Sequence, residues 1–79
     1  MQKTNKEQFL KLLGQKLAFL REAYGVDEEK LYQMIDKDRL DEIENGIGKP
    51  IDVFEFDALV SLYHADASLL IDSVWKDAA

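Results

Sequence analysis

Two stretches of the chain decide the fold: residues 13–31, LGQKLAFLREAYGVDEEKL, and residues 40–46, LDEIENG. In both stretches, apolar residues recur at three- or four-residue intervals, which places their side chains on one face of an α-helix. Gly25 is typical of a helix C-terminus, and Asp27 is a good N-cap for a helix that begins directly after it. The pattern therefore predicts short helices joined by tight turns.

A long helix that ends at Tyr24 is predicted through the first stretch. Thr4 and Glu7 have the spacing of a capping box, in which the Thr4 hydroxyl accepts the amide of residue 7 and Glu7 reaches back. Gly14 lies mid-helix at a cost of about 1 kcal/mol relative to Ala, which indicates close backbone packing there. The apolar residues cover half of the helix surface, so we expect this helix to be the spine of the core. They are Phe9, Leu10, Leu12, Leu13, Leu17, Phe19, Leu20, Ala23 and Tyr24.

Two short helices are predicted next. Asp27 caps the second helix, and either Asp36 or Asp38 caps the third, because Asp side chains accept hydrogen bonds from free amides at helix starts. Gly46 ends the third helix. The residues that we expect on the inner sides are Leu31, Met34 and Ile35 in the second helix and Leu40 and Ile43 in the third.

The rest of the chain predicts one loop and two more helices. Residues 45–50 form the loop, Asp52 and Glu55 form a second capping box that opens the fourth helix, and Asp66 caps the fifth. No segment alternates for long enough to be a strand. We therefore predict an all-α, five-helix, single domain over residues 1–79. The fourth helix buries some of Val53, Phe54, Phe56, Leu59, Val60, Leu62 and Tyr63, and Leu69, Leu70, Val74 and Trp75 anchor the fifth.

The composition excludes several classes of function. The chain has 79 residues, no cysteine and one histidine, His64, so it has no disulfide, no thiolate nucleophile and no cysteine- or histidine-rich metal site. One histidine and scattered serines make no nucleophilic triad, and no spacing singles out a pair of carboxylates. We therefore expect no enzymatic activity, no catalytic or metal-binding residues and no cofactor.

The charge is distributed unevenly. Acidic residues outnumber basic ones 16 to 10, for a net charge of −6. Residues 1–21 carry five basic residues against Glu7 alone, whereas the remaining 58 residues are strongly acidic. Such asymmetry is often a signal for a binding partner. The chain has no long apolar run and no signal-peptide pattern at its start, so we expect a cytoplasmic protein without membrane contact.

The order of these motifs resembles the Cro/C1-type (XRE-like) helix-turn-helix family over about residues 10–71. The resemblance rests on the stretch from Leu13 to Leu31 and on the segment from Leu40 to Gly46, which looks like that family's recognition helix. It implies a lambda-repressor-like, five-helix, DNA-binding domain. It also implies a structural ion pair between Arg21 and Glu44, which orients helices more than it stabilises them.

The sequence departs from the family pattern at the turn. Leu31 and Glu44 are separated by two residues fewer than in the family, and Met34 stands where the family has a turn glycine. The angle between the two helices decides how a recognition helix enters the major groove. The recognition segment is also acidic, which opposes approach to phosphates.

The predicted DNA contacts lie in and after the third helix. Lys37, Arg39 and Asn45 are the candidates for base edges, and Lys49 is the candidate for a phosphate. Asp38 is placed to accept a hydrogen bond from a cytosine amino group. The alternative is that Lys37 and Arg39 are surface residues that pair locally with Asp41 or Glu42.

Two functional hypotheses remain open. The first is a small transcriptional regulator that binds double-stranded DNA as a homodimer. The second is a degenerate, acidic module that binds a basic protein partner instead of DNA, as an antirepressor or modulator does. The fourth helix, with Phe54, Phe56 and Val60, has more apolar surface than one small core needs, so part of it is expected to serve the homodimer.

Overall fold

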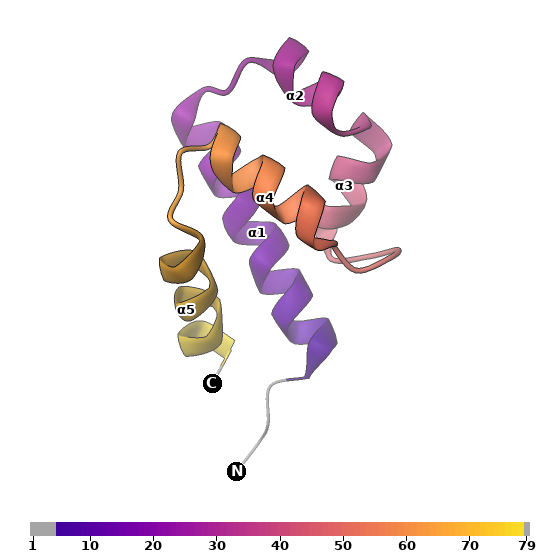
Figure 1. The fold of residues 1–79 in the computed structure, drawn as a ribbon. Helices are drawn as coiled ribbons and strands as arrows, with labels where there is room; N and C mark the ends of the chain where they lie inside the picture. Colours follow the sequence, from indigo (N-terminus) through magenta and orange to yellow (C-terminus); the bar gives the residue numbers. More distant parts are fainter. Residues whose placement is uncertain (1–4, 79) are drawn as a thin grey trace.

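The computed structural model describes residues 5–78, which form five α-helices and no strand (Figure 1). The predicted all-α, five-helix fold is thus confirmed, and its helix order is consistent with a helix-turn-helix-like domain. None of the described helices is long and apolar enough to cross a membrane. The helices are α1 (Lys6–Tyr24), α2 (Glu28–Met34), α3 (Lys37–Asn45), α4 (Val53–Leu62) and α5 (Ala67–Ala78).

Helix α1 is the spine of the domain and packs closely against α3 and α5 (Figure 1). Close backbone packing at Gly14 was predicted, and the structure shows that the neighbour is α3. A Cβ atom at Gly14 would collide with the carbonyl oxygen of Ile43 and would lie 2.6 Å from that of Glu44. A side chain at this position would therefore push the end of α3 away from α1.

The core is formed by residues from all five helices and from the α2–α3 turn. Tyr63, which follows α4, is completely buried at its centre. Ile35 belongs to the core although it follows α2, because its extended backbone turns the side chain inward. The core residues are Leu13, Leu17, Leu31, Ile35, Leu40, Ile43, Leu59, Tyr63 and Val74.

Several apolar residues that the sequence placed in the core are exposed. Phe19 and Tyr24 of α1 are both more than half exposed, beside an open cleft that they line together with residues of α5. Met34 points outward because Ile35 takes the inner position at the end of α2. Leu69 and Trp75, the predicted anchors of α5, are likewise exposed. Of the apolar residues of α4, only some were expected to be buried, and Val53 and Phe54 are the exposed ones.

The helix starts follow the predicted chemistry with one shift. The N-cap of α1 is Asn5, whose side chain accepts a hydrogen bond from Gln8 N at 2.8 Å, and not Thr4, which lies outside the described residues. Asn caps as well as Thr or better, so the helix begins one residue later. The structure selects Asp36 over Asp38 as the cap of α3. The predicted caps of α2, α4 and α5 are confirmed.

Candidate partner-binding surface

Helices α2 and α3 form the helix-turn-helix-like pair, joined only by Ile35 and Asp36. Both linking residues have extended backbones, and each has a defined role: Ile35 packs in the core and Asp36 caps α3. The turn therefore closes without the glycine of the family pattern. Four of the five predicted contact residues belong to α3, and Lys49 lies in the loop that follows it.

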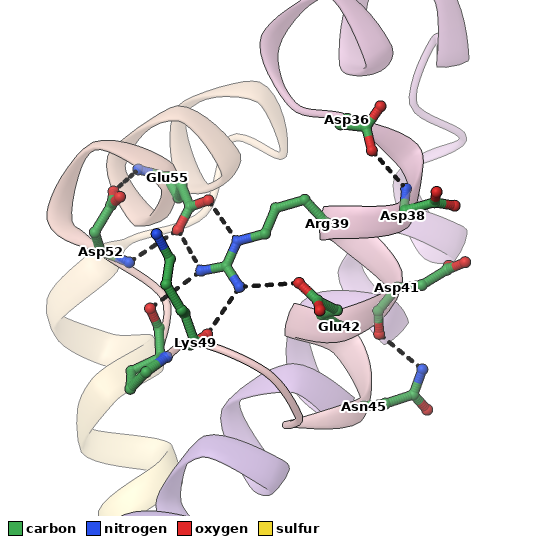
Figure 2. A network of polar contacts seen from close by, with 10 residues as sticks. Asp36, Asp38, Arg39, Asp41, Glu42, Asn45, Lys49, Asp52 and Glu55 are labelled. Atoms are coloured by element: carbon green, nitrogen blue, oxygen red, sulfur yellow. Dashed lines mark hydrogen bonds and ion pairs between the residues drawn. The ribbon is translucent and has the colours of Figure 1, made fainter.

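The structure separates the five predicted contact residues into two groups. Lys37, Asp38 and Asn45 lie on the exposed side of α3, and Lys49 is exposed in the following loop. Arg39 instead extends from the opposite side of α3 toward the first turn of α4 (Figure 2). Its side chain is only 16% exposed.

Arg39 is held by hydrogen bonds to two carboxylates and two carbonyl oxygens (Figure 2). Its Nε donates to Glu55 Oε2 at 2.7 Å, and its Nη2 donates to Glu55 Oε1 at 2.8 Å. The carbonyl oxygens of Lys49 and Pro50 accept at 2.8 and 3.1 Å, and Glu42 accepts at 3.4 Å. The guanidinium thus ties α3 to the loop and to α4, and this geometry offers no bidentate fork to a base.

The electrostatics of this cluster follow from the paired geometry. The hydrogen bonds from Arg39 lower the pKa of Glu55 to about 2, although burial acts in the opposite direction. The same bonds raise the pKa of Arg39. The backbone N–H of Asp52 and the charge of Lys49 also favour the ionised Glu55 carboxylate. The pair is therefore ionised under all physiological conditions.

The sequence contained a signal for the inward position of Arg39. Arg39 lies four residues before Ile43, and residues at that spacing share one face of a helix. Ile43 was already assigned to the core, so Arg39 is next to the buried side of α3. Glu55 was not predicted as the ion-pair partner of Arg39, because it was interpreted only as a capping residue. It performs both roles, since Glu55 Oε1 also accepts from Asp52 N at 3.0 Å.

Arg21 and Glu44, the pair that the resemblance implies, are joined by two hydrogen bonds. Arg21 Nε donates to Glu44 Oε2 at 2.7 Å, and Arg21 Nη2 donates to Glu44 Oε1 at 3.0 Å. The bonds connect α1 to the end of α3, and the Glu44 side chain is largely buried. Both side chains therefore serve to position α3.

The remaining predicted contacts are available in different degrees. Asn45 Nδ2 donates to the carbonyl oxygen of Asp41 at 2.7 Å, so part of its hydrogen-bonding capacity is used at the end of α3. Lys37 and Lys49 form no ion pair with any of residues 5–78. Lys37 is therefore the only free cation on the described part of α3.

Carboxylates dominate what is left on α2 and α3. We call the following exposed residues the acidic surface: Asp27, Glu28, Glu29, Asp36, Asp38 and Asp41. Lys30 and Lys37 are the exposed bases on the same pair of helices. Asp38 and Asp41 point away from the Arg39 cluster, on the outer side of α3 (Figure 2). Asp27 and Asp36 also cap their helices, which leaves four acids without a capping role.

A smaller basic region lies at the other end of α3. Lys6 and Lys11 of α1, with Glu7 between them, line a shallow cleft with the loop residues 46–48, and Lys49 follows in the same loop. None of these three lysines forms an ion pair within residues 5–78. Lys3, which belongs to the same basic segment of the sequence, lies outside the described residues.

Comparison with known proteins adds no relative. No protein-family model, no curated protein and no solved structure matches the chain. The function must therefore be argued from the surface itself.

Proposed function

We propose that this chain is a non-catalytic, cytoplasmic binding module of the Cro/C1-like helix-turn-helix type, whose acidic surface binds a basic surface of a partner protein. The observation that carries the proposal is the position of Arg39. Because the one arginine of α3 is bound to Glu55 and to the loop, the exposed charges of α2, α3 and their N-caps are six carboxylates and only two lysines. Opposite charge is what such a surface attracts.

Coulomb's law argues against DNA at this surface. Phosphates give duplex DNA a dense negative charge, and a protein gains affinity chiefly by neutralising phosphates with Lys and Arg. Here Asp38 and Asp41 occupy the outer side of α3, where they would approach the DNA backbone. Lys37 alone cannot offset them, because each acid repels phosphates over roughly the same distance as a lysine attracts them.

Apolar side chains on α2 favour a protein as the partner. Met34 is half exposed, and Tyr32 is more than one-third exposed, on the same helix that carries Glu28 and Glu29. Tyr and Met are enriched at protein interfaces, where they supply contact area inside a polar rim. An apolar contact of this kind, next to carboxylates, fits a partner that presents Lys or Arg around an apolar patch.

The basic region supports DNA binding as the second candidate. Lys6, Lys11 and Lys49 are free to contact phosphates, and a local basic face can dock an acidic protein on DNA. For this candidate, the lysines contact the phosphate backbone of DNA, and such contacts carry little information about the base sequence. The homodimer expected from the family resemblance belongs to this DNA-binding candidate.

Two titrations distinguish the candidates. Fluorescence anisotropy at low salt is recorded with a labelled random-sequence DNA duplex and, separately, with a labelled peptide rich in Lys and Arg. The proposal predicts saturable binding of the peptide and none of the duplex at micromolar protein. Duplex binding that weakens steeply with salt, and that is lost in Lys6→Gln/Lys11→Gln/Lys49→Gln, would establish the second candidate instead.

A further inference from the structure

Helix α2 is held to the rest of the domain by little buried surface. Of its seven residues, only Leu31 is buried, and all the others are exposed. Helix α1 packs closely against α3 and α5, whereas α2 packs that closely against no other helix. Figure 1 shows α2 crossing the end of the domain that lies farthest from the two termini. Burial of an apolar face supplies most of the stability of a short helix in a protein, so α2 is only weakly stabilised.

Helix α2 also lacks the polar contacts that fix α3. Within residues 5–78, no side chain of α2 forms a hydrogen bond or an ion pair with another helix. Helix α3 is instead fixed on two sides. Arg21 of α1 binds Glu44 near the end of α3. Arg39 of α3 binds Glu55 of α4. The two helices of the helix-turn-helix-like pair are therefore anchored very differently.

The residues on either side of α2 set the limits of a unit that can unfold separately. Gly25, before the N-cap, has a left-handed backbone with φ of 57°, and no atom lies within 4 Å of the position that a Cβ would take. Ile35, directly after α2, is buried in the core. A helix as short as α2 is not stable alone in water, because helix formation has a costly nucleus. Once Leu31 leaves the core, α2 therefore unfolds between Gly25 and Ile35 while α3 stays fixed.

The exposed residues of α2 are those to which the proposed function assigns the partner. Glu28 and Glu29 form no ion pair within residues 5–78, and Tyr32 and Met34 are exposed on the same helix. A partner that contacts these four side chains together needs the folded helix, since unfolding separates them. By linkage, such a partner shifts α2 toward its closed, folded state.

We infer that α2 opens and unfolds as a separate unit, and that binding of the basic partner closes it. The inference rests on the proposed function, which supplies the partner. Opening divides the acidic surface, because three of its six acids lie on or cap α2 and three lie on or cap α3. Closure on the partner assembles the whole surface. The acids that separate from α3 when α2 opens are Asp27, Glu28 and Glu29.

Native-state hydrogen exchange tests the separate opening, and it is followed by NMR on the full chain from zero to sub-denaturing urea. The amides of residues 31–35 should be at least about tenfold less protected than those of residues 41–44 in α3. Exchange in residues 31–35 should hardly change with urea, because a local opening exposes little surface, whereas exchange in α3 should rise steeply. Equal protection and equal urea dependence of the two segments would overturn the inference.

Arg39→Ala provides a second measurement of the separate opening. The substitution weakens the anchoring of α3 whether α2 is closed or open. Exchange in residues 41–44 should therefore become at least about tenfold faster, while exchange in residues 31–35 stays within about twofold of wild type. Lys37→Ala, on the exposed side of α3, is the control and should change neither segment. Equal acceleration of both segments by Arg39→Ala would show that α2 opens only with the whole domain.

The coupling is tested with a peptide rich in Lys and Arg and with a control peptide in which Ser replaces every Lys and Arg. At about ten times its Kd, the basic peptide should raise the protection of residues 31–35 by about tenfold, and the control peptide should leave it unchanged. If the basic peptide binds and protects residues 41–44 but not residues 31–35, the coupling is overturned and the proposed function stands. If the basic peptide does not bind at micromolar protein, the proposed function fails, and the inference fails with it.

Discussion

Arg39 and Glu55 join α3 to the first turn of α4 through two parallel hydrogen bonds of 2.7 and 2.8 Å. The same Glu55 carboxylate completes the capping box with Asp52, so one side chain both starts α4 and fixes α3. The loop between the two helices is held by the same guanidinium through the carbonyl oxygens of Lys49 and Pro50. An arginine in the predicted recognition helix is thereby a structural residue.

Removing this arginine is expected to destabilise the domain. The Arg39 and Glu55 side chains are 16% and 20% exposed, between a surface pair, which contributes less than about 1 kcal/mol, and a buried pair, whose disruption costs about 3–5 kcal/mol. We predict a loss of about 2 kcal/mol in the free energy of unfolding for Arg39→Ala, measured by urea denaturation. Lys37→Ala, on the exposed side of α3, should change it by less than about 0.5 kcal/mol. Equal stability of the two variants would show that the network is dispensable.

At low pH, Glu55 should lose its contribution to the free energy of unfolding. Its folded-state pKa is about 2, below the ordinary value of 4.5, so the unfolded state takes up its proton first as the pH falls. The stabilisation is therefore complete above the ordinary value and is lost as the pH falls toward about 2. We predict that wild type exceeds Glu55→Gln by about 2 kcal/mol near neutral pH, a shift discounted for partial exposure. Urea melts at falling pH should show the gap closing; a constant gap contradicts the assignment.

Gly14→Ala tests the contact between α1 and α3. The new Cβ would meet the carbonyl oxygens of Ile43 and Glu44, which are backbone atoms and cannot turn aside. The gain of about 1 kcal/mol in helix propensity is outweighed by overpacking, so we predict a net loss of about 2 kcal/mol. Thermal denaturation measures the change, and the neighbouring exposed residue provides the control, Gln15→Ala, which should not destabilise. A Gly14→Ala variant as stable as wild type would mean that α3 can shift freely.

Tyr63→Phe should be neutral or stabilising. The Tyr63 hydroxyl is buried and has no hydrogen-bond partner among residues 5–78, so its removal relieves a desolvated polar group. We predict a gain of up to about 1 kcal/mol in chemical denaturation. Burial also raises the pKa of Tyr63 from 10.0 to about 12, so wild type loses stability as the pH rises through this range and the variant is spared that loss. A clear loss of stability at neutral pH would reveal a hydrogen bond that holds the hydroxyl.

Most of the fold was predictable because it depends on local chemistry, whereas contacts between segments that are distant in the sequence were not predictable. The caps at Asp27 and Asp52 and the close approach at Gly14 depend on neighbours or on backbone geometry, which the sequence displays directly. The Arg39–Glu55 pair joins residues 16 positions apart, and neither has a feature that marks the other. Periodicity also overestimated the core, because an apolar arc on α1 shows which residues can be buried and not which ones a neighbour covers.

The sequence predicted the acidic charge of the candidate surface, but not the inward position of Arg39. The acids of α3 are visible in the sequence, and they motivated the protein-binding alternative. The inward position of Arg39, on which the proposal of a protein partner rests, depends on where α4 begins relative to α3. That relationship follows from the packing of three helices, so it required the structure.

The most direct test of the proposed function compares two variants of equal charge. A labelled peptide rich in Lys and Arg is titrated with wild type, with Asp38→Asn/Asp41→Asn on the acidic surface, and with Glu7→Gln/Glu22→Gln on exposed positions of α1. Loss of a desolvated charge contact weakens binding by a few kcal/mol, so we predict a reduction of at least about tenfold for the first variant and less than about twofold for the second. Equal reductions in the two variants would mean that net charge alone attracts the peptide, and the acidic surface of α2 and α3 would not be the binding site.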